Sequence, residues 1–234
     1  MTGDGDVAPV DATVAEALAT RSDVDLGWLR ADAEDDWALT SEALRFVVRL
    51  VQLVSPADVV ELGSGRSTRV LARTAEAMSP APRITALEND PDAATRTRAA
   101  LERDGTSGSV ELRFAPVVVR RCQGRQVPVY HLGEGALRGR ADVILVDGPP
   151  MPLGGREGAL YQAVDLATQG ALIVLDDAHR ESEVSALDHL AEGLGDRIRV
   201  ELLDGFDKGL AVVRVLEATA LSMEIDQGAT GRGR

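Results

Sequence analysis

Two kinds of hydrophobic pattern alternate along the chain. After residue 40, apolar side chains recur at Leu44, Val47, Val48 and Val51, a spacing that places them on one face of a helix, and Pro56 marks the end of that helix. Elsewhere the apolar residues form short continuous runs, which are typical of strands buried in the middle of a sheet. These runs predict five strands, at 57–62, 83–88, 109–115, 141–146 and 171–175.

Helical segments separate most of these strands. The pattern predicts helices at 67–78, from Asn89 or Asp90 onward, at 157–168 and at 181–194. Strands joined through helices at this spacing form a parallel sheet with right-handed crossovers. Two last strands, 197–203 and 209–216, are joined by a short turn and must pair antiparallel. We therefore predict an α/β fold, a Rossmann-like, doubly wound, seven-stranded mixed sheet with one antiparallel strand and helices on both faces.

The pattern also divides the chain into three parts. Residues 1–39 precede the first predicted helix and form an N-terminal leader, residues 40–216 form one folded domain, and residues 217–234 lack a periodic apolar face and form a flexible tail. Within the domain, residues 116–140 contain two apolar runs around a polar turn. They fit either a hairpin or a loop with a short helix.

The composition narrows the class of protein. With 44% hydrophobic and 27% charged residues the chain is typical of a globular protein, and its net charge of −13 argues against nucleic acid as a partner. No apolar run is long enough to span a bilayer, and the N-terminus lacks the features of a signal peptide, so we expect a cytoplasmic protein without a membrane partner. The single cysteine, Cys122, agrees with a reducing compartment. A homodimer is one oligomeric state that the sequence leaves open.

Polar residues collect where the predicted strands end, which is where open parallel sheets bind ligands. Gly63 and Gly65 follow the first strand and permit close approach of a ligand, and the next helix offers unpaired N–H groups at Ser67 and Thr68. Glu88 ends the second strand, where a carboxylate can accept hydrogen bonds from the two hydroxyls of a ribose. The alternatives are glycines used for turn geometry alone and a solvated acid at the end of a strand.

Two residues bear on which nucleoside this turn would bind. Dinucleotide-binding turns usually carry a third glycine or an alanine where this chain has Thr68. Glu61, two residues before the first glycine, would repel a pyrophosphate but suits a cationic amino acid or a sulfonium group.

The segments VVELGSGRST, ITALENDP and ADVILVDGPP, in this order, resemble the class I S-adenosylmethionine-dependent methyltransferases from about Trp37 to Val215. The resemblance implies that Ser64 and its flanking glycines follow the methionine and ribose of the cofactor, that Glu88 holds the ribose hydroxyls, and that Asn89 lies beside the adenine. Ala115 matches the position whose backbone meets the adenine edge. The implied cofactor site comprises Glu61, Gly63, Ser64, Gly65, Ser67, Thr68, Glu88, Asn89, Ala115 and Asp147.

Within that superfamily, the VDGPP and DDAHR segments are similar to bacterial small-molecule methyltransferases and to metal-dependent O-methyltransferases. In the latter, three acids at the positions of Asp147, Asp176 and Asp177 hold magnesium. A divalent cation would also explain why three carboxylates converge, because like charges resist burial together. The alternatives are that Asp147 contacts the methionine amine, that Asp177 caps the next helix, and that Asp176 acts alone.

The remaining candidates concern the methyl acceptor. His179 is a candidate general base because its pKa is ordinarily near neutral, and Asp147 and Asp177 complete the candidate catalytic set; alternatively His179 binds substrate or only begins a helix. Arg156 and Arg180 are candidate clamps for an anionic substrate group, with surface ion pairs as the alternative. In the resembling fold the segment before the first strand commonly covers the cofactor, so Trp37 is a candidate lid or substrate wall, with core packing as the alternative.

These patterns together predict a methyltransferase that moves a methyl group from S-adenosylmethionine to a small molecule. A hydroxyl is the expected acceptor, with a magnesium ion or another divalent cation as a candidate cofactor. An amine acceptor, an NAD-dependent oxidoreductase and a non-catalytic nucleoside-binding module are the alternatives.

Overall fold

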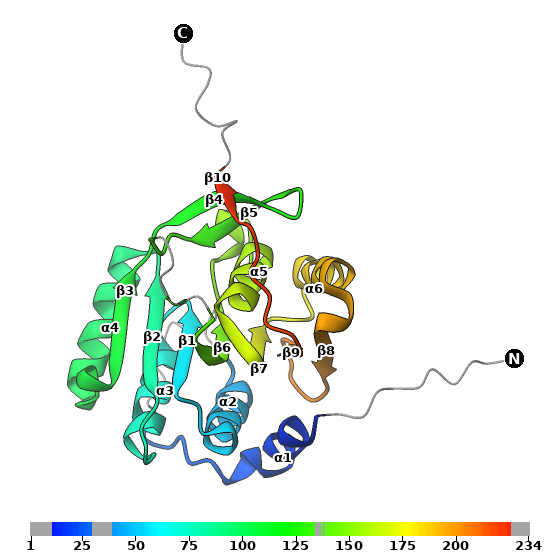
Figure 1. The fold of residues 1–234 in the computed structure, drawn as a ribbon. Coiled ribbons are helices and arrows are strands. Elements are labelled where there is room, and N and C mark those ends of the chain that lie inside the picture. Colours follow the sequence, from blue (N-terminus) through cyan, green and yellow to red (C-terminus); the bar gives the residue numbers. More distant parts are fainter. Residues whose placement is uncertain (1–10, 30–38, 134–136, 138, 226–234) are drawn as a thin grey trace, which may run out of the picture.

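A seven-stranded sheet forms the centre of the computed structural model, which describes residues 11–29, 39–133, 137 and 139–225 (Figure 1). The strand order is β3-β2-β1-β6-β7-β9-β8. The strands are β1 (Asp58–Leu62), β2 (Arg83–Glu88), β3 (Val110–Phe114), β6 (Ala141–Val146), β7 (Ala167–Asp176), β8 (Ile198–Leu203) and β9 (Leu210–Val215).

Strand directions agree with the sequence pattern. The pairs among β3, β2, β1, β6 and β7 are all parallel, whereas β9 runs antiparallel to both of its neighbours, β7 and β8. The predicted doubly wound mixed sheet with one antiparallel strand is therefore confirmed. The strand order reverses between β1 and β6, so the ligand end of the fold is expected at their carboxyl ends.

Helices cover both faces of the sheet, and two hydrophobic cores result. Successive residues of β1 point to opposite faces, so that Val59 belongs to the same core as Leu44 and Leu71, while Val60 belongs to the core that contains Leu160 and Leu187. The helices are α1 (Ala12–Thr20), α2 (Ser41–Val54), α3 (Arg66–Glu76), α4 (Pro91–Asp104), α5 (Glu157–Leu166) and α6 (Glu181–Leu194). The side chains of α2 and α3 belong to the first core, and those of α5 and α6 to the second.

Residues 116–140, for which the pattern left two alternatives, contain a hairpin. Strands β4 (Val117–Cys122) and β5 (Arg125–Tyr130) pair antiparallel, and β10 (Glu224–Ile225) adds a third strand beside β4 (top of Figure 1). The hairpin is fixed to α5 by Gln162, whose side chain accepts a hydrogen bond from Tyr130 N at 3.0 Å and donates one to Tyr130 O at 2.8 Å. Gly158 permits this packing, because a Cβ atom there would lie 1.9 Å from Pro128 O.

Both ends of the described chain pack against the domain. In the N-terminal leader, α1 lies on α2, and Asp11 forms an ion pair with Arg214 of β9 at 2.5 Å. The tail was predicted to be flexible from residue 217, yet Leu221 is buried and its N–H donates to the Asp165 carboxylate at 2.9 Å. Strand β10 then continues the three-stranded sheet, so the described tail is attached to the domain at Leu221 and at β10.

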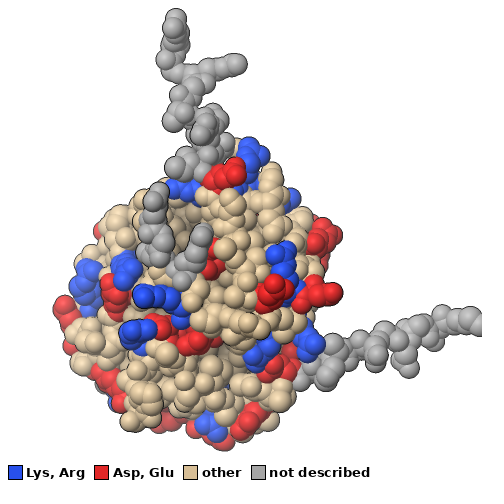
Figure 2. All heavy atoms as spheres, in the orientation of Figure 1, with Lys and Arg blue, Asp and Glu red and all other residues tan. Residues whose placement is uncertain are grey.

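The molecular surface carries both signs of charge. On the face shown in Figure 2, basic and acidic side chains are interspersed rather than gathered in one large basic patch. Within the part of the chain that the structure describes, none of the helices combines the length and the apolar character needed to cross a membrane.

Candidate active site

The glycine-rich turn lies at the carboxyl end of β1, between that strand and α3. Gly63 and Gly65 have φ angles of +120° and +147°, which residues with side chains rarely adopt. A Cβ atom at Gly63 would contact the backbone of Asp147 and Gly148 at 3.4 Å, so the turn runs close along the end of β6. A Cβ atom at Gly65 would have nothing within 4 Å, and this leaves open space at the amino end of α3 where a ligand could approach the backbone.

Glu61 fixes the glycine-rich turn through hydrogen bonds to the first residues of α3. Its fully buried carboxylate accepts hydrogen bonds from the Ser67 and Thr68 hydroxyls, the second at 2.6 Å, and the Thr68 hydroxyl in turn accepts one from Gly65 N at 2.8 Å. Burial raises the pKa of Glu61 to about 7 despite these hydrogen bonds. Three residues predicted to touch the cofactor therefore bond to one another, and they shape the turn.

Glu88 lies opposite the turn at the end of β2. One of its carboxylate oxygens accepts a hydrogen bond from the Ser64 hydroxyl at 2.6 Å, and the other accepts one from Asp90 N at 2.9 Å. Asn89 follows and is half-buried. Ala115 is buried beside Glu88 and donates its N–H to the Glu88 carbonyl at 2.8 Å. The structure thus brings together the residues predicted for the ribose and adenine, with the carboxylate fixed toward the glycine-rich turn.

Tyr130 is a residue of this site that the sequence pattern did not single out. It ends β5, is buried, and its hydroxyl has no hydrogen-bond partner among the described residues. The hydroxyl lies against the segment that follows β6, because a Cβ atom at Gly148 would be 2.2 Å from it. Burial and the nearby carboxylates of Glu88 and Asp147 raise the pKa of Tyr130 well above its ordinary value, so the group stays protonated and can donate. Only the hairpin brings Tyr130 here, and the segment carries no motif that would have indicated it.

The three predicted acids meet at the carboxyl ends of β6 and β7. One oxygen from each of Asp147, Asp176 and Asp177 lies within 4.8 Å of the other two. Asp176 and Asp177 are buried, and Asp177 adopts a φ of +57°, in the left-handed region that residues with side chains rarely adopt. Burial raises the pKa of Asp147 well above its ordinary value, and the neighbouring carboxylates add to this while Arg156 opposes it.

Arg156 lies inside this acidic cluster, where its sequence position had suggested a substrate clamp. Its side chain is only 5% exposed, and its Nη2 atom lies 2.8 Å from Asp147 Oδ1 and 2.7 Å from Asp177 Oδ2. Its Nη1 atom donates to the Asp176 carbonyl at 2.6 Å. Arg180 reaches Asp177 Oδ2 from the outer side at 3.0 Å and is 34% exposed. Of the two predicted clamps, only Arg180 retains a solvent-facing guanidinium.

The other predicted acceptor-site residues are less enclosed. His179 is exposed just beyond the acidic cluster, and its N–H donates to the Lys208 carbonyl at 3.2 Å. Gly209 allows this close approach, because a Cβ atom there would lie 2.5 Å from the His179 backbone and ring. Trp37, the candidate lid residue, lies outside the described residues.

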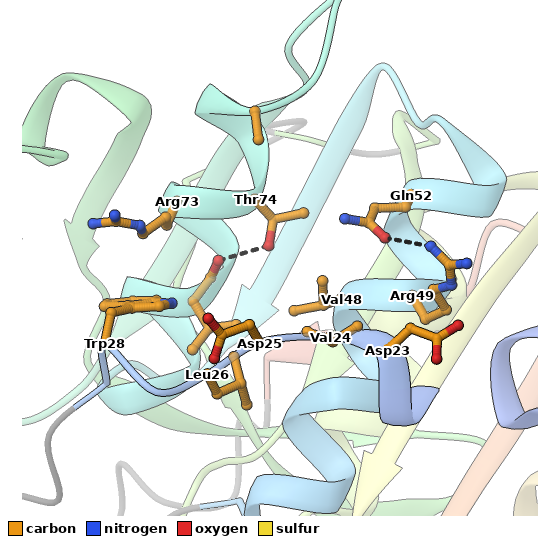
Figure 3. A pocket seen from close by; sticks show the side chains of 12 residues that line it. Asp23, Val24, Asp25, Leu26, Trp28, Val48, Arg49, Gln52, Arg73 and Thr74 are labelled. Carbon is orange, nitrogen blue, oxygen red and sulfur yellow. Dashed lines mark hydrogen bonds between the residues drawn. The ribbon is translucent and has the colours of Figure 1, made fainter. Parts of the chain in front are cut away.

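A separate cavity of about 300 Å³ lies between α2, α3 and residues 23–28 (Figure 3). The Trp28 ring faces it, with the Arg73 guanidinium 4.7 Å from the ring centroid. Arg73 belongs to the last turn of α3, whereas the glycine-rich turn precedes the first turn, so Trp28 packs at the end of α3 remote from the site.

The fold and the site define the protein's class. A seven-stranded sheet with the single antiparallel strand β9, a glycine-rich turn after β1 and an acid at the end of β2 are the arrangement of the class I methyltransferases. The acidic cluster of Asp147, Asp176 and Asp177 lies at the same edge of the sheet.

Comparison with known proteins gives the family. A family model described as a methyltransferase domain matches residues 60–178, just over half of the chain, so the chain belongs to this family and the predicted methyltransferase is confirmed. No curated protein sequence matches significantly.

Solved structures share the fold at low sequence identity. An O-methyltransferase from Bacillus cereus in complex with SAH superposes with a TM-score of 0.57 at 21% identity, over 89% of this chain and 93% of that one. The O-methyltransferase TomG from Streptomyces achromogenes, in complex with SAM, gives 0.57 at 18% identity, with coverages of 89% and 92%. The SAH-bound Podospora anserina methyltransferase PaMTH1 gives 0.58 at 20% identity and 88% coverage of both chains.

Proposed function

We propose that this methyltransferase uses S-adenosylmethionine to methylate a hydroxyl group of a small molecule. The observation that carries the proposal is the placement of Glu88, whose buried carboxylate faces the glycine-rich turn through Ser64. Structural relatives crystallised with SAM or SAH, two of them O-methyltransferases, support both the cofactor and the acceptor type.

The residues at the strand ends fit this cofactor. Open space beside Gly65 and the amino end of α3 would receive the methionine and ribose portion, and Glu88 would accept hydrogen bonds from the ribose hydroxyls. Asn89 and the backbone of Ala115 would flank the adenine. The unpartnered Tyr130 hydroxyl is a further donor that points into the same region.

Methyl transfer requires the sulfur, the methyl carbon and the acceptor oxygen to lie in line, so alignment of the two ligands supplies most of the rate enhancement. The acceptor loses its proton as the new bond forms. His179 is the proposed base, since it is exposed at the acidic edge of the sheet, whereas Asp177 is buried and paired with two arginines.

A divalent metal, also predicted from the three acids, has less support. The carboxylates converge as a metal site requires, but Arg156 already supplies a positive charge among them. The proposed reaction therefore needs no metal. Methylation of an amine, which needs no metal, is the second candidate on this ground.

Transfer of a tritium-labelled methyl group from S-adenosylmethionine to panels of small hydroxylated and aminated compounds tests the proposal. We expect labelled product from hydroxylated acceptors, identified by mass spectrometry as an O-methyl compound. Label found only in N-methyl products would show that the acceptor is an amine and not a hydroxyl. Hydride exchange with NAD in place of methyl transfer would overturn the proposal.

A further inference from the structure

The acidic cluster of Asp147, Asp176 and Asp177 encloses a positively charged side chain, that of Arg156. Three carboxylates within 4.8 Å are arranged as ligands of a divalent cation, which favours several oxygen ligands. In this chain, however, Nη2 of Arg156 bridges Asp147 Oδ1 and Asp177 Oδ2, at 2.8 and 2.7 Å. A metal ion that bridged the same two oxygens would compete with the guanidinium for them and would lie beside a buried positive charge.

The backbone around Arg156 and its hydrogen bonds hold its side chain in the acidic cluster, unlike the side chain of a surface arginine. Gly154 and Gly155, with φ angles of +104° and +76°, turn the chain so that Arg156 stands at the start of α5 with its side chain directed inward. Beyond the two ion pairs, its guanidinium donates to the main-chain carbonyls of Asp147 and Asp176, at 3.0 and 2.6 Å. A guanidinium held by both carboxylates and carbonyls is a fixed part of the site.

The balance of charges in the cluster also favours Arg156 over a metal ion as its cation. A buried cluster of three acids without a cation would resist ionisation. Arg156 supplies one positive charge at its centre, and Arg180 supplies a second at its outer side. Asp176 Oδ2 is left buried without a hydrogen-bond partner among the described residues, so one acceptor of the cluster remains for a donor of the cofactor or substrate.

We propose that Arg156 takes the place of a divalent metal in this site and positions Asp147 and Asp177 for a metal-free methyl transfer. The inference rests on the proposed function only for the reaction; the replacement of a metal by Arg156 concerns the protein alone. It assigns Arg156 a positioning role within the acidic cluster, and it makes the cluster a latent metal site that opens when the guanidinium is removed.

Binding of Mn²⁺ alone, followed by electron paramagnetic resonance and calorimetry, tests this without any methyl transfer. Wild type and Asp176→Asn should bind Mn²⁺ equally weakly. Arg156→Ala should bind it roughly tenfold or more tightly, because a unit charge about 4 Å away is removed, and Arg156→Ala combined with Asp176→Asn should lose the gain. Arg180→Ala is the comparison variant: it removes a partly exposed arginine from the same Asp177 oxygen and should gain less affinity than Arg156→Ala, because solvent screens its charge.

Wild-type binding of Mn²⁺ that Asp176→Asn abolishes would overturn the inference, even if Arg156→Ala failed to fold. A folded Arg156→Ala that gained no affinity would overturn it as well. Binding of S-adenosylhomocysteine by the same wild-type preparation separates this inference from the proposed function. If wild type failed to bind S-adenosylhomocysteine, the proposed function would fail, but the inference about Arg156 and Mn²⁺ would be unaffected.

Discussion

Tyr130 carries a buried hydroxyl group that has no hydrogen-bond partner among the described residues. A buried donor without an acceptor lowers the stability of a fold by about 1–3 kcal/mol. The Tyr130 hydroxyl lies beside Gly148, close enough to Glu88 and Asp147 for their charges to act on it. Such a group is better explained by a bound ligand than by stability. The Tyr130 hydroxyl should therefore lower the stability of the protein without a ligand and strengthen the binding of the cofactor.

Replacement of Tyr130 by phenylalanine tests that opposition. Tyr130→Phe should raise the melting temperature of the ligand-free protein, or leave it unchanged, and should weaken the binding of S-adenosylhomocysteine roughly fivefold, since one hydrogen bond of about 1 kcal/mol is lost. Scanning calorimetry and titration calorimetry measure the two effects. Tyr161→Phe, in the same core but on α5, is the control and should leave binding unchanged. A destabilised Tyr130→Phe with full affinity would mean that the hydroxyl serves the fold.

At the scale of elements, contact with α5 holds the β4–β5 hairpin over the site. Gly158 on α5 and Gly193 on α6 both face the hairpin, but they meet different atoms. A Cβ atom at Gly158 would lie 1.9 Å from the Pro128 carbonyl oxygen, whereas one at Gly193 would meet only the end of the Gln123 side chain, at 2.0 Å. A backbone cannot move aside as a flexible side chain can.

The two glycines therefore form a matched pair of substitutions. Gly158→Ala should lower the free energy of unfolding by about 1–3 kcal/mol, because the overpacked strand must shift. Gly193→Ala should be neutral or stabilising by up to about 1 kcal/mol, since alanine favours the helix. Denaturant unfolding of both variants measures this difference. Equal effects of the two would show that the hairpin does not pack on α5 as described.

The elements also show what a sequence pattern can and cannot predict. Buried parallel strands are continuous apolar runs, and the residues that follow them must meet at one edge, so the sheet and the convergence of Glu88, Asp147 and Asp176 could be predicted. The hairpin could be given only as one of two alternatives, because Val119 is exposed and Pro128 lies within β5. Arg156 was noticed, but chain position does not determine the direction of a side chain, and its inward turn depends on three-dimensional charge balance.

For the molecule as a whole, the buried acid under the glycine-rich turn couples stability to pH. The ordinary pKa of a glutamate is 4.5, and burial raises that of Glu61 to about 7 in the folded protein. The folded state thus retains a proton that the unfolded chain has lost. The stabilising contribution is fully present below pH 4.5 and is lost as pH rises through about 7.

Glu61→Gln should remove that part of the pH dependence. Between pH 4 and pH 8, the change in the free energy of unfolding should shrink by up to about 3 kcal/mol, at about 1.4 kcal/mol per unit of pKa shift. Urea unfolding across this range measures it, and Glu192→Gln, at an exposed carboxyl, gives the baseline for losing one acid. An unchanged pH profile would show that Glu61 is ionised in the folded protein as readily as in the unfolded one.

The central claim is that the edge formed by β1, β2 and β6 binds S-adenosylmethionine through Glu88. Calorimetric titration of S-adenosylhomocysteine into wild type and Glu88→Ala tests it most directly, with Glu111→Ala, an exposed acid of β3, as the control. We predict binding by wild type and by the control, and affinity at least about tenfold weaker in Glu88→Ala, because hydrogen bonds to a charged group contribute about 1.5–3 kcal/mol each. Absence of binding by wild type, or equal affinity in a folded Glu88→Ala, would contradict the claim.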